Sequence, residues 1–78
     1  MDKTQHTLRY ARLLAALRRT RLEAGLTQID VARRLDVYAS YVSKIESGER
    51  RLDVIELAEF CRVYGTGLKA FLDAAGLD

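Results

Sequence analysis

Residues 27–50 read TQIDVARRLDVYASYVSKIESGER, and the fold of the chain is decided by this stretch. Thr27 is a favourable helix N-cap, and Asp30 three residues later completes a pair that resembles a capping box. These signals predict a helix over about residues 28–35. Its apolar positions are Ile29, Val31, Ala32 and Leu35.

A second short helix is predicted after a turn at residues 36–37. It covers about residues 39–47 and ends at Gly48, and its buried positions are Val42 and Ile45. Because Ala32 is small, the two helices can cross closely near a right angle. One face of the second helix then projects from the body of the protein, as in a helix-turn-helix that binds DNA, although a generic helical hairpin fits the same pattern.

The flanking sequence adds three further amphipathic helices. They are expected over about residues 8–24, 54–64 and 68–75, each ended by a glycine. On the first of them, Leu13 and Leu17 belong to one apolar face, and a second apolar strip consists of Leu8, Ala11, Leu14 and Leu22. The chain contains no proline. We therefore expect an all-α fold, with a polar extension at residues 1–7 and a single compact five-helix domain at residues 8–78.

Composition excludes several classes of protein. With one cysteine and one histidine, the 78-residue chain has no intrachain disulfide and no plausible metal-ligand set. His6 has no catalytic partner nearby in sequence, and Cys61 reads as a packed thiol. Because there is also no phosphate-binding glycine loop, we expect no enzyme activity and no cofactor. No apolar run approaches 18 residues, so we expect a cytoplasmic protein without a membrane span.

Charge is distributed unevenly along the chain. Residues 1–26 carry six basic and two acidic side chains, whereas residues 53–78 carry two basic and five acidic ones. One end of the protein could therefore face a polyanion while the other avoids it. Solvated helix faces of mixed sign explain the same distribution equally simply.

Residues 26–65 closely resemble the Xre/Cro-type helix-turn-helix family of bacterial and phage regulators. The matching pieces are Leu26-Thr27-Gln28, Val31-Ala32-x-x-Leu35, the run from Ser40 to Gly48, and the helix that ends at Tyr64-Gly65. The resemblance implies a lambda-repressor-like fold and a sequence-specific, double-stranded DNA-binding transcriptional regulator, usually a homodimer and here expected to be a repressor. A protein-interaction module of the same fold, such as an antitoxin or an adaptor, is the alternative.

The resemblance also implies which residues contact DNA. With the helix at residues 39–47 in the major groove, the expected base contacts are Ala39, Ser40, Ser43 and Lys44. The expected contacts to the DNA backbone are Thr27, Gln28, Tyr38, Tyr41, Ser47, Arg50 and Arg51. Two of these residues stay open between interpretations. Gln28 grips a phosphate or is a solvated surface residue, and Tyr41 donates its hydroxyl to a phosphate while packing on the helix at 28–35, or only packs.

Two structural roles are also expected, the first from the same resemblance and the second from the apolar residues near the end of the chain. Arg21 and Glu46 match a partly buried ion pair that links the first helix to the end of the third. Phe71, Leu72 and Leu77 are expected to form the dimer interface, because this tail carries more apolar side chains than a monomer needs. The competing interpretation is that they cover the second apolar strip of the first helix.

Three residues depart from the family pattern. Asp36 stands where many members have glycine, at a site that often needs a left-handed backbone. Tyr38 has no capping hydroxyl within reach of its own turn, and Ala39 replaces a frequent Arg or Gln. We therefore expect weaker base reading at the start of the third helix, with more of the affinity coming from phosphate contacts, Lys44 and DNA shape.

Overall fold

A computed structural model describes residues 7–77 of the chain. Within that range the protein consists of five α-helices and contains no strand. The helices are α1 (Leu8–Glu23), α2 (Gln28–Leu35), α3 (Ala39–Glu46), α4 (Val54–Tyr64) and α5 (Leu68–Ala75). The predicted all-α, five-helix fold is confirmed, and every helix boundary lies within one residue of its predicted position.

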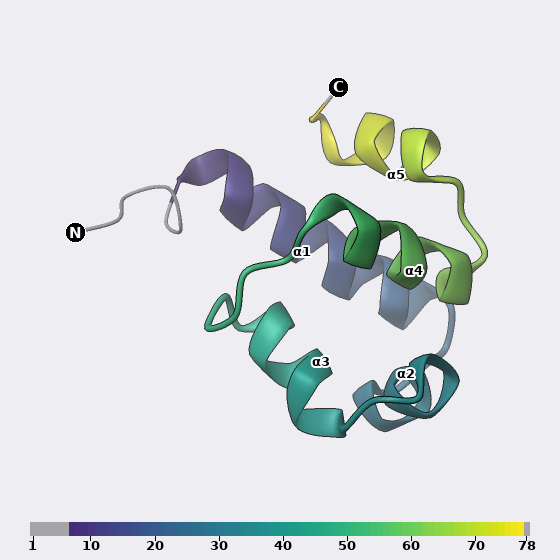
Figure 1. Cartoon of the computed structure of the whole chain (residues 1–78). Coiled ribbons are helices and arrows are strands. Elements are labelled where there is room, and N and C mark those ends of the chain that lie inside the picture. Colours follow the sequence, from purple (N-terminus) through teal and green to yellow (C-terminus); the bar gives the residue numbers. More distant parts are fainter. Residues whose placement is uncertain (1–6, 78) are drawn as a thin grey trace.

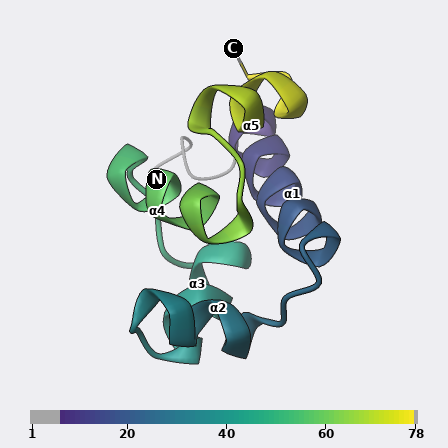
Figure 2. The same ribbon diagram turned by 90° about the vertical axis from the view of Figure 1, so that its right-hand side faces the viewer.

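The helix pair α2–α3 forms one end of the molecule, and α5 lies at the opposite end (Figures 1 and 2). The long helix α1 and the helix α4 fill the space between these ends. Helix α2 packs against both α3 and α4, while α1 contacts α3 and α5. The α2–α3 unit is thus fixed to the rest of the protein by the two central helices.

The hydrophobic core lies where these helices converge. Its fully buried side chains, largest first, are Phe60, Leu17, Ile45, Val31, Val42 and Cys61. Val42 and Ile45 are the predicted buried pair of α3, and Ala32 is buried on α2 as its place in the crossing requires. Burial raises the pKa of the Cys61 thiol, which keeps this side chain in its neutral, packed form.

The prediction of a second apolar strip on α1 is wrong in part, because most of its residues are exposed to solvent. Leu8 and Leu22 are exposed, whereas Tyr10 and Ala16 are buried instead. The reason is that α3 and α5 pack against the same broad face of α1 and leave its remaining surface in solvent. Ile29 on α2 is also exposed, whereas Val31, two residues later on the same helix, is fully buried.

The helix caps agree with the sequence signals. The predicted pair, Thr27 with Asp30, forms a complete capping box in which each partner's side chain bonds the other's backbone, and Asp53 with Glu56 forms a second one at the start of α4. At the start of α3, Tyr38 makes no side-chain cap bond, as expected. Helix α3 therefore depends on its tertiary contacts, more than on its own sequence, for its position.

The turn between α2 and α3 contains a strained residue. Asp36 has φ 58° and ψ 49°, and it is the one non-glycine residue with a positive φ in the described part of the chain. The left-handed backbone expected at this position is confirmed. Because an L side chain crowds its own carbonyl group there, this conformation costs about 1–2 kcal/mol for an ordinary residue and less for Asp.

Replacing Asp36 with Gly should therefore raise the free energy of unfolding slightly, since relief of strain outweighs the larger backbone entropy of Gly in the unfolded chain. Asp36→Ala is the matched control, because it removes the same charge but keeps a Cβ. We expect the Gly variant to exceed the Ala variant by about 1 kcal/mol in urea denaturation. Equal stabilities would show that the turn carries no backbone strain.

Candidate nucleic-acid interface

A buried ion pair connects α1 to the end of α3. The Nε of Arg21 lies 2.7 Å from Oε2 of Glu46, and its Nη2 donates to Oε1 of Glu46 at 3.0 Å. Both side chains are more than nine-tenths buried, at 8% and 5% exposed. The hydrogen bonds that Arg21 donates to Glu46 raise the pKa of Arg21 above its usual range, so the guanidinium stays charged. The third nitrogen, Nη1, donates to the carbonyl of Leu26 at 3.0 Å.

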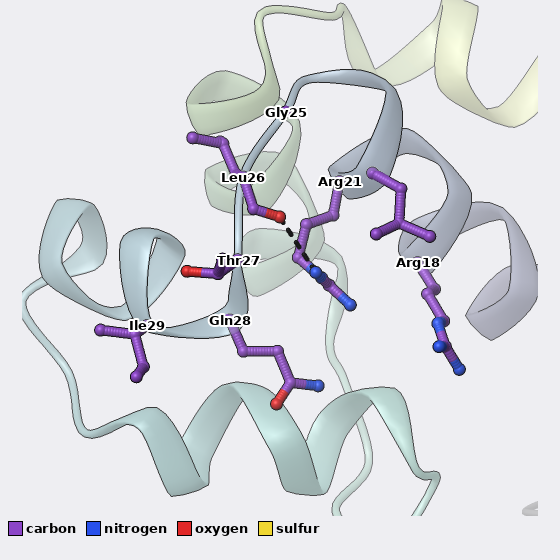
Figure 3. Close-up of a pocket in the computed structure, with 8 residues that line it drawn as sticks. Arg18, Arg21, Gly25, Leu26, Thr27, Gln28 and Ile29 are labelled. Carbon is purple, nitrogen blue, oxygen red and sulfur yellow. Dashed lines mark hydrogen bonds between the residues drawn. The ribbon is translucent and has the colours of Figure 1, made fainter.

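Gln28 ties the beginning of α2 into the same network. Its Nε2 donates to Oε1 of Glu46 at 3.0 Å, and Figure 3 shows the side chain reaching from α2 toward α3. The carboxylate of Glu46 thus accepts bonds from two other helices. The network fixes the direction in which α3 projects, and it leaves the second amide hydrogen of Gln28 available for a ligand.

An open hollow lies beside this network, at the junction of α1 and α2 (Figure 3). It is lined by Arg18, Arg21, Thr27 and Gln28, among others. The Thr27 hydroxyl accepts the backbone N–H of Asp30, so it acts as a helix cap here. Backbone N–H groups at a helix N-terminus favour an anion, and an exposed guanidinium nearby adds to this preference.

Arg18 lines the hollow but was not among the residues predicted to contact DNA. In the sequence it contributed only to the basic charge of the first 26 residues. It is exposed, and its place three residues before Arg21 on α1 puts both side chains on one helix face. That spacing was the available signal. It would have placed a second arginine next to the expected ion pair.

The outer face of α3 is polar and open to solvent. The four residues expected to contact bases, Ala39, Ser40, Ser43 and Lys44, are all exposed. Tyr38, just before the helix, is 86% exposed. Ser47 is also exposed, but its hydroxyl already donates to the carbonyl of Lys44 at 3.1 Å. The structure thus brings most of the expected contact residues onto one continuous helix surface.

Tyr41 faces the body of the protein. Its ring lies parallel to that of Phe60 on α4, with the ring centroids 6.2 Å apart. Burial raises the pKa of Tyr41, and the carboxylate of Glu56 near it acts in the same direction. A hydroxyl near a carboxylate is poorly placed for a phosphate, because the two negative charges repel each other.

The two arginines of the loop after α3 are held in different ways. Arg50 forms an ion pair with Glu56 at 3.0 Å, whereas the guanidinium of Arg51 lies over the ring of Tyr10, 4.5 Å from its centroid. The hydroxyl of Tyr10 also accepts the backbone N–H of Leu52 at 3.2 Å, which anchors the loop to α1. The expected roles of the two arginines are therefore no longer equivalent, because the charge of Arg50 is already compensated.

The expected dimer interface needs one correction. Phe71 is only 3% exposed and belongs to the hydrophobic core, so it was wrong to expect it on an apolar surface offered to a partner. Leu72 and Leu77 are half-buried against the same core, and the carbonyl of Leu77 accepts a bond from Arg9 at 2.9 Å. The physical reason is that α5 folds back onto α1, where Phe71 fills space between helices.

Residues 7–77 contain neither a cluster of metal-ligating side chains nor a membrane-spanning helix. No group of three or more His, Cys, Asp or Glu side chains in this range is arranged to hold a metal ion. None of the helices described here has both the length and the apolar character needed to cross a membrane.

Known proteins resemble this chain at both the sequence and the structural level. Residues 11–78 match the model of a family described as a helix-turn-helix domain. A solved structure described as an XRE-family like protein, from Pseudomonas syringae pv. tomato str. DC3000, is 49% identical in sequence and superposes with a TM-score of 0.86. That match covers 95% of this chain and 90% of the other. A comparison with curated protein sequences gave no match.

Removing the charge of Glu46 tests the buried network. Glu46→Gln keeps the side-chain shape but leaves the guanidinium of Arg21 buried without a counter-charge, so it should lower the free energy of unfolding by roughly 3 kcal/mol. Urea denaturation followed by circular dichroism measures this loss. Glu59→Gln is the control, because its ion pair with Arg62 is exposed and should be worth less than about 0.5 kcal/mol. Similar losses in both variants would contradict the role given to Glu46.

Proposed function

The chain belongs to the helix-turn-helix family of Xre type, and from this premise we propose that it regulates transcription as a homodimer that binds double-stranded DNA sequence-specifically. Membership places the protein among DNA-binding regulators, whose fold is typical of proteins without enzyme activity. The observation that carries the proposal is the buried Arg21–Glu46–Gln28 network. It holds α3 rigidly by one end and leaves the opposite, polar face of the helix exposed.

Helix α3 is proposed to enter the major groove of DNA. Lys44 has the reach and the charge to contact guanine O6 and N7, while Ser40 and Ser43 can bond either bases or phosphates. Ala39 offers only a methyl group, which suits the methyl of thymine. With one long base-reading side chain, the protein would derive a larger share of its preference from DNA shape.

Contacts to the DNA backbone are proposed on both sides of α3. On one side lie Gln28, Thr27 and Arg18 around the hollow at the start of α2, where backbone N–H groups favour a phosphate. On the other side lies Arg51. Its guanidinium stacks on Tyr10, and it forms no ion pair with any carboxylate of residues 7–77. Tyr38 and Ser47 complete the proposed backbone set.

The proposed homodimer would bind two half-sites about one helical turn of DNA apart. Of the three residues expected at the interface, Leu72 and Leu77 are only partly buried and keep exposed apolar surface. Leu72 belongs to α5, which lies at the end of the molecule opposite α2–α3 (Figure 1). Repression would follow from blocking access of the polymerase to DNA, and activation by contact with polymerase is equally compatible with this arrangement.

A second candidate function is supported by one observation. Tyr38 is almost fully exposed next to Val37, which is also exposed, and aromatic and apolar side chains of this kind are enriched in protein interfaces. The same fold would then bind a protein through this surface, as an antitoxin or an adaptor does.

Salt dependence separates the two functions. The proposed regulator should bind a random-sequence duplex at low salt, measured by fluorescence anisotropy. The logarithm of its binding constant should fall linearly with the logarithm of salt concentration. Arg18→Ala should make the slope less steep by about 0.9, the value for one phosphate contact. Arg19→Ala is the matched control, because Arg19 lines a different groove between α1 and α5. Absence of binding at low salt would refute DNA binding and favour the protein partner.

Selection of bound sequences from a random duplex pool tests base reading and the dimer together. We expect selected sites to contain two symmetric half-sites. In the Lys44→Ala variant, the preference at one position of each half-site should weaken by about 1–3 kcal/mol, the worth of one good base contact. An unchanged preference would show that Lys44 reads no base, and single half-sites would argue against a homodimer.

A further inference from the structure

Arg50 lies beside the surface that is proposed to face DNA. Its backbone N–H donates to the carbonyl of Lys44 at 3.0 Å, so the chain turns back against the end of α3 at this residue. An arginine side chain that starts at this point is within its own length of the outer face of α3. On position alone, Arg50 is therefore as well placed as Arg51 to neutralise a phosphate.

Three contacts nevertheless hold the guanidinium of Arg50 against the protein. Its Nη2 lies 3.0 Å from Oε2 of Glu56, and its Nη1 donates to the carbonyl of Arg51 at 3.1 Å. Its central carbon lies 4.8 Å from the centroid of the Tyr41 ring. The bond with Glu56 raises the pKa of Arg50 and lowers that of Glu56, so both groups are charged in the pair.

The carboxylate of Glu56 serves two separate purposes with its two oxygens. Oε1 accepts the backbone N–H of Asp53 at 2.9 Å and completes the capping box of α4. Oε2 binds Arg50. A capping box works equally well with Gln at this position, so the cap requires only Oε1. The hydrogen bonds of the cap therefore leave Oε2 of Glu56 for Arg50.

We propose that Glu56 limits the affinity of the protein for DNA by holding Arg50 in an internal ion pair, away from the phosphate backbone. A carboxylate and a phosphate compete for the same guanidinium donors. While Arg50 is paired with Glu56, it neutralises no phosphate and releases no counterion, and it adds nothing to the salt dependence of binding. This inference rests on the proposed DNA-binding function and assigns Glu56 a role as a positioning residue within it.

Glu56→Gln tests this role, because the amide oxygen can keep the cap to Asp53 while the amide nitrogen replaces the oxygen that holds Arg50. In a salt titration with a random-sequence duplex, we expect a slope steeper by about 0.9 than that of the wild type, as for one added phosphate contact. Between 1 M and 0.1 M salt this slope corresponds to a gain of about eightfold in affinity relative to the wild type.

Glu59→Gln is the matched control. It removes the same charge from the next turn of α4 and also releases an arginine, Arg62, but this arginine belongs to the last turn of α4 and not to the loop that follows α3. Its slope should equal that of the wild type. Adding Arg50→Ala to Glu56→Gln should return the slope to the wild-type value, because the released cation is then absent.

The possible outcomes separate three cases: restraint of Arg50 by Glu56, simple loss of a negative charge, and absence of DNA binding. If Glu56→Gln and Glu59→Gln give the same slope, Glu56 does not restrain Arg50. If the gain persists without Arg50, it comes from the loss of a repulsive charge, and the inference is also overturned. If the wild type shows no salt-dependent binding, the proposed DNA-binding function itself fails, whereas the first two results leave that function intact.

Discussion

The buried ion pair between Arg21 and Glu46 is the interaction on which the geometry of this protein depends. Moving two charges out of water is costly, and the cost is offset only when nearly all their hydrogen-bonding groups find partners. Here Arg21 bonds both oxygens of Glu46 and the carbonyl of Leu26, and Gln28 gives Glu46 a further donor. Separating Arg21 from Glu46 would leave two buried charges unpaired, and separating Gln28 would remove one of the bonds to the carboxylate. The network therefore fixes α1, α2 and α3 in one relative orientation.

This lock explains how a helix of only eight residues can present a defined surface. Helix α3 has no side-chain cap at its start, and helices of this length are marginal in isolation. Its inner face is held by Val42, Ile45 and Glu46, while Lys44, on the same turn as these last two, points to solvent. Neighbouring residues of α3 thus pack its inner face against the protein and make its outer face polar.

The sequence was sufficient to predict the helices, because these depend on local signals, and the family resemblance was sufficient to predict the pairing of Arg21 with Glu46. Capping pairs, glycine ends and apolar spacing located all five helices, and Asp36 was recognised as a left-handed residue. Side-chain partners were harder to foresee. An apolar residue such as Phe71 looks the same in sequence whether it meets its own core or another subunit. The pairing of Arg50 with Glu56 joins a loop to the next helix, and no periodicity encodes it.

Within the described part of the chain, Arg50 is paired with a carboxylate and Arg51 is not, and this difference bears on how well the proposed regulator would discriminate between DNA sequences. A phosphate contact strengthens binding to every DNA sequence, and only base contacts and DNA shape separate the correct site from the rest. With Ala39 and two serines on the proposed reading face, this protein has little base-contact energy to offset strong non-specific binding. Under these conditions an additional free arginine would retain the protein on random DNA without improving its discrimination. In the proposed complex, Arg51 has no carboxylate partner among residues 7–77 and would contact a phosphate, whereas Arg50 would stay paired with Glu56. This pairing would limit the sequence-independent part of the affinity, so that weak base reading could still discriminate between sites.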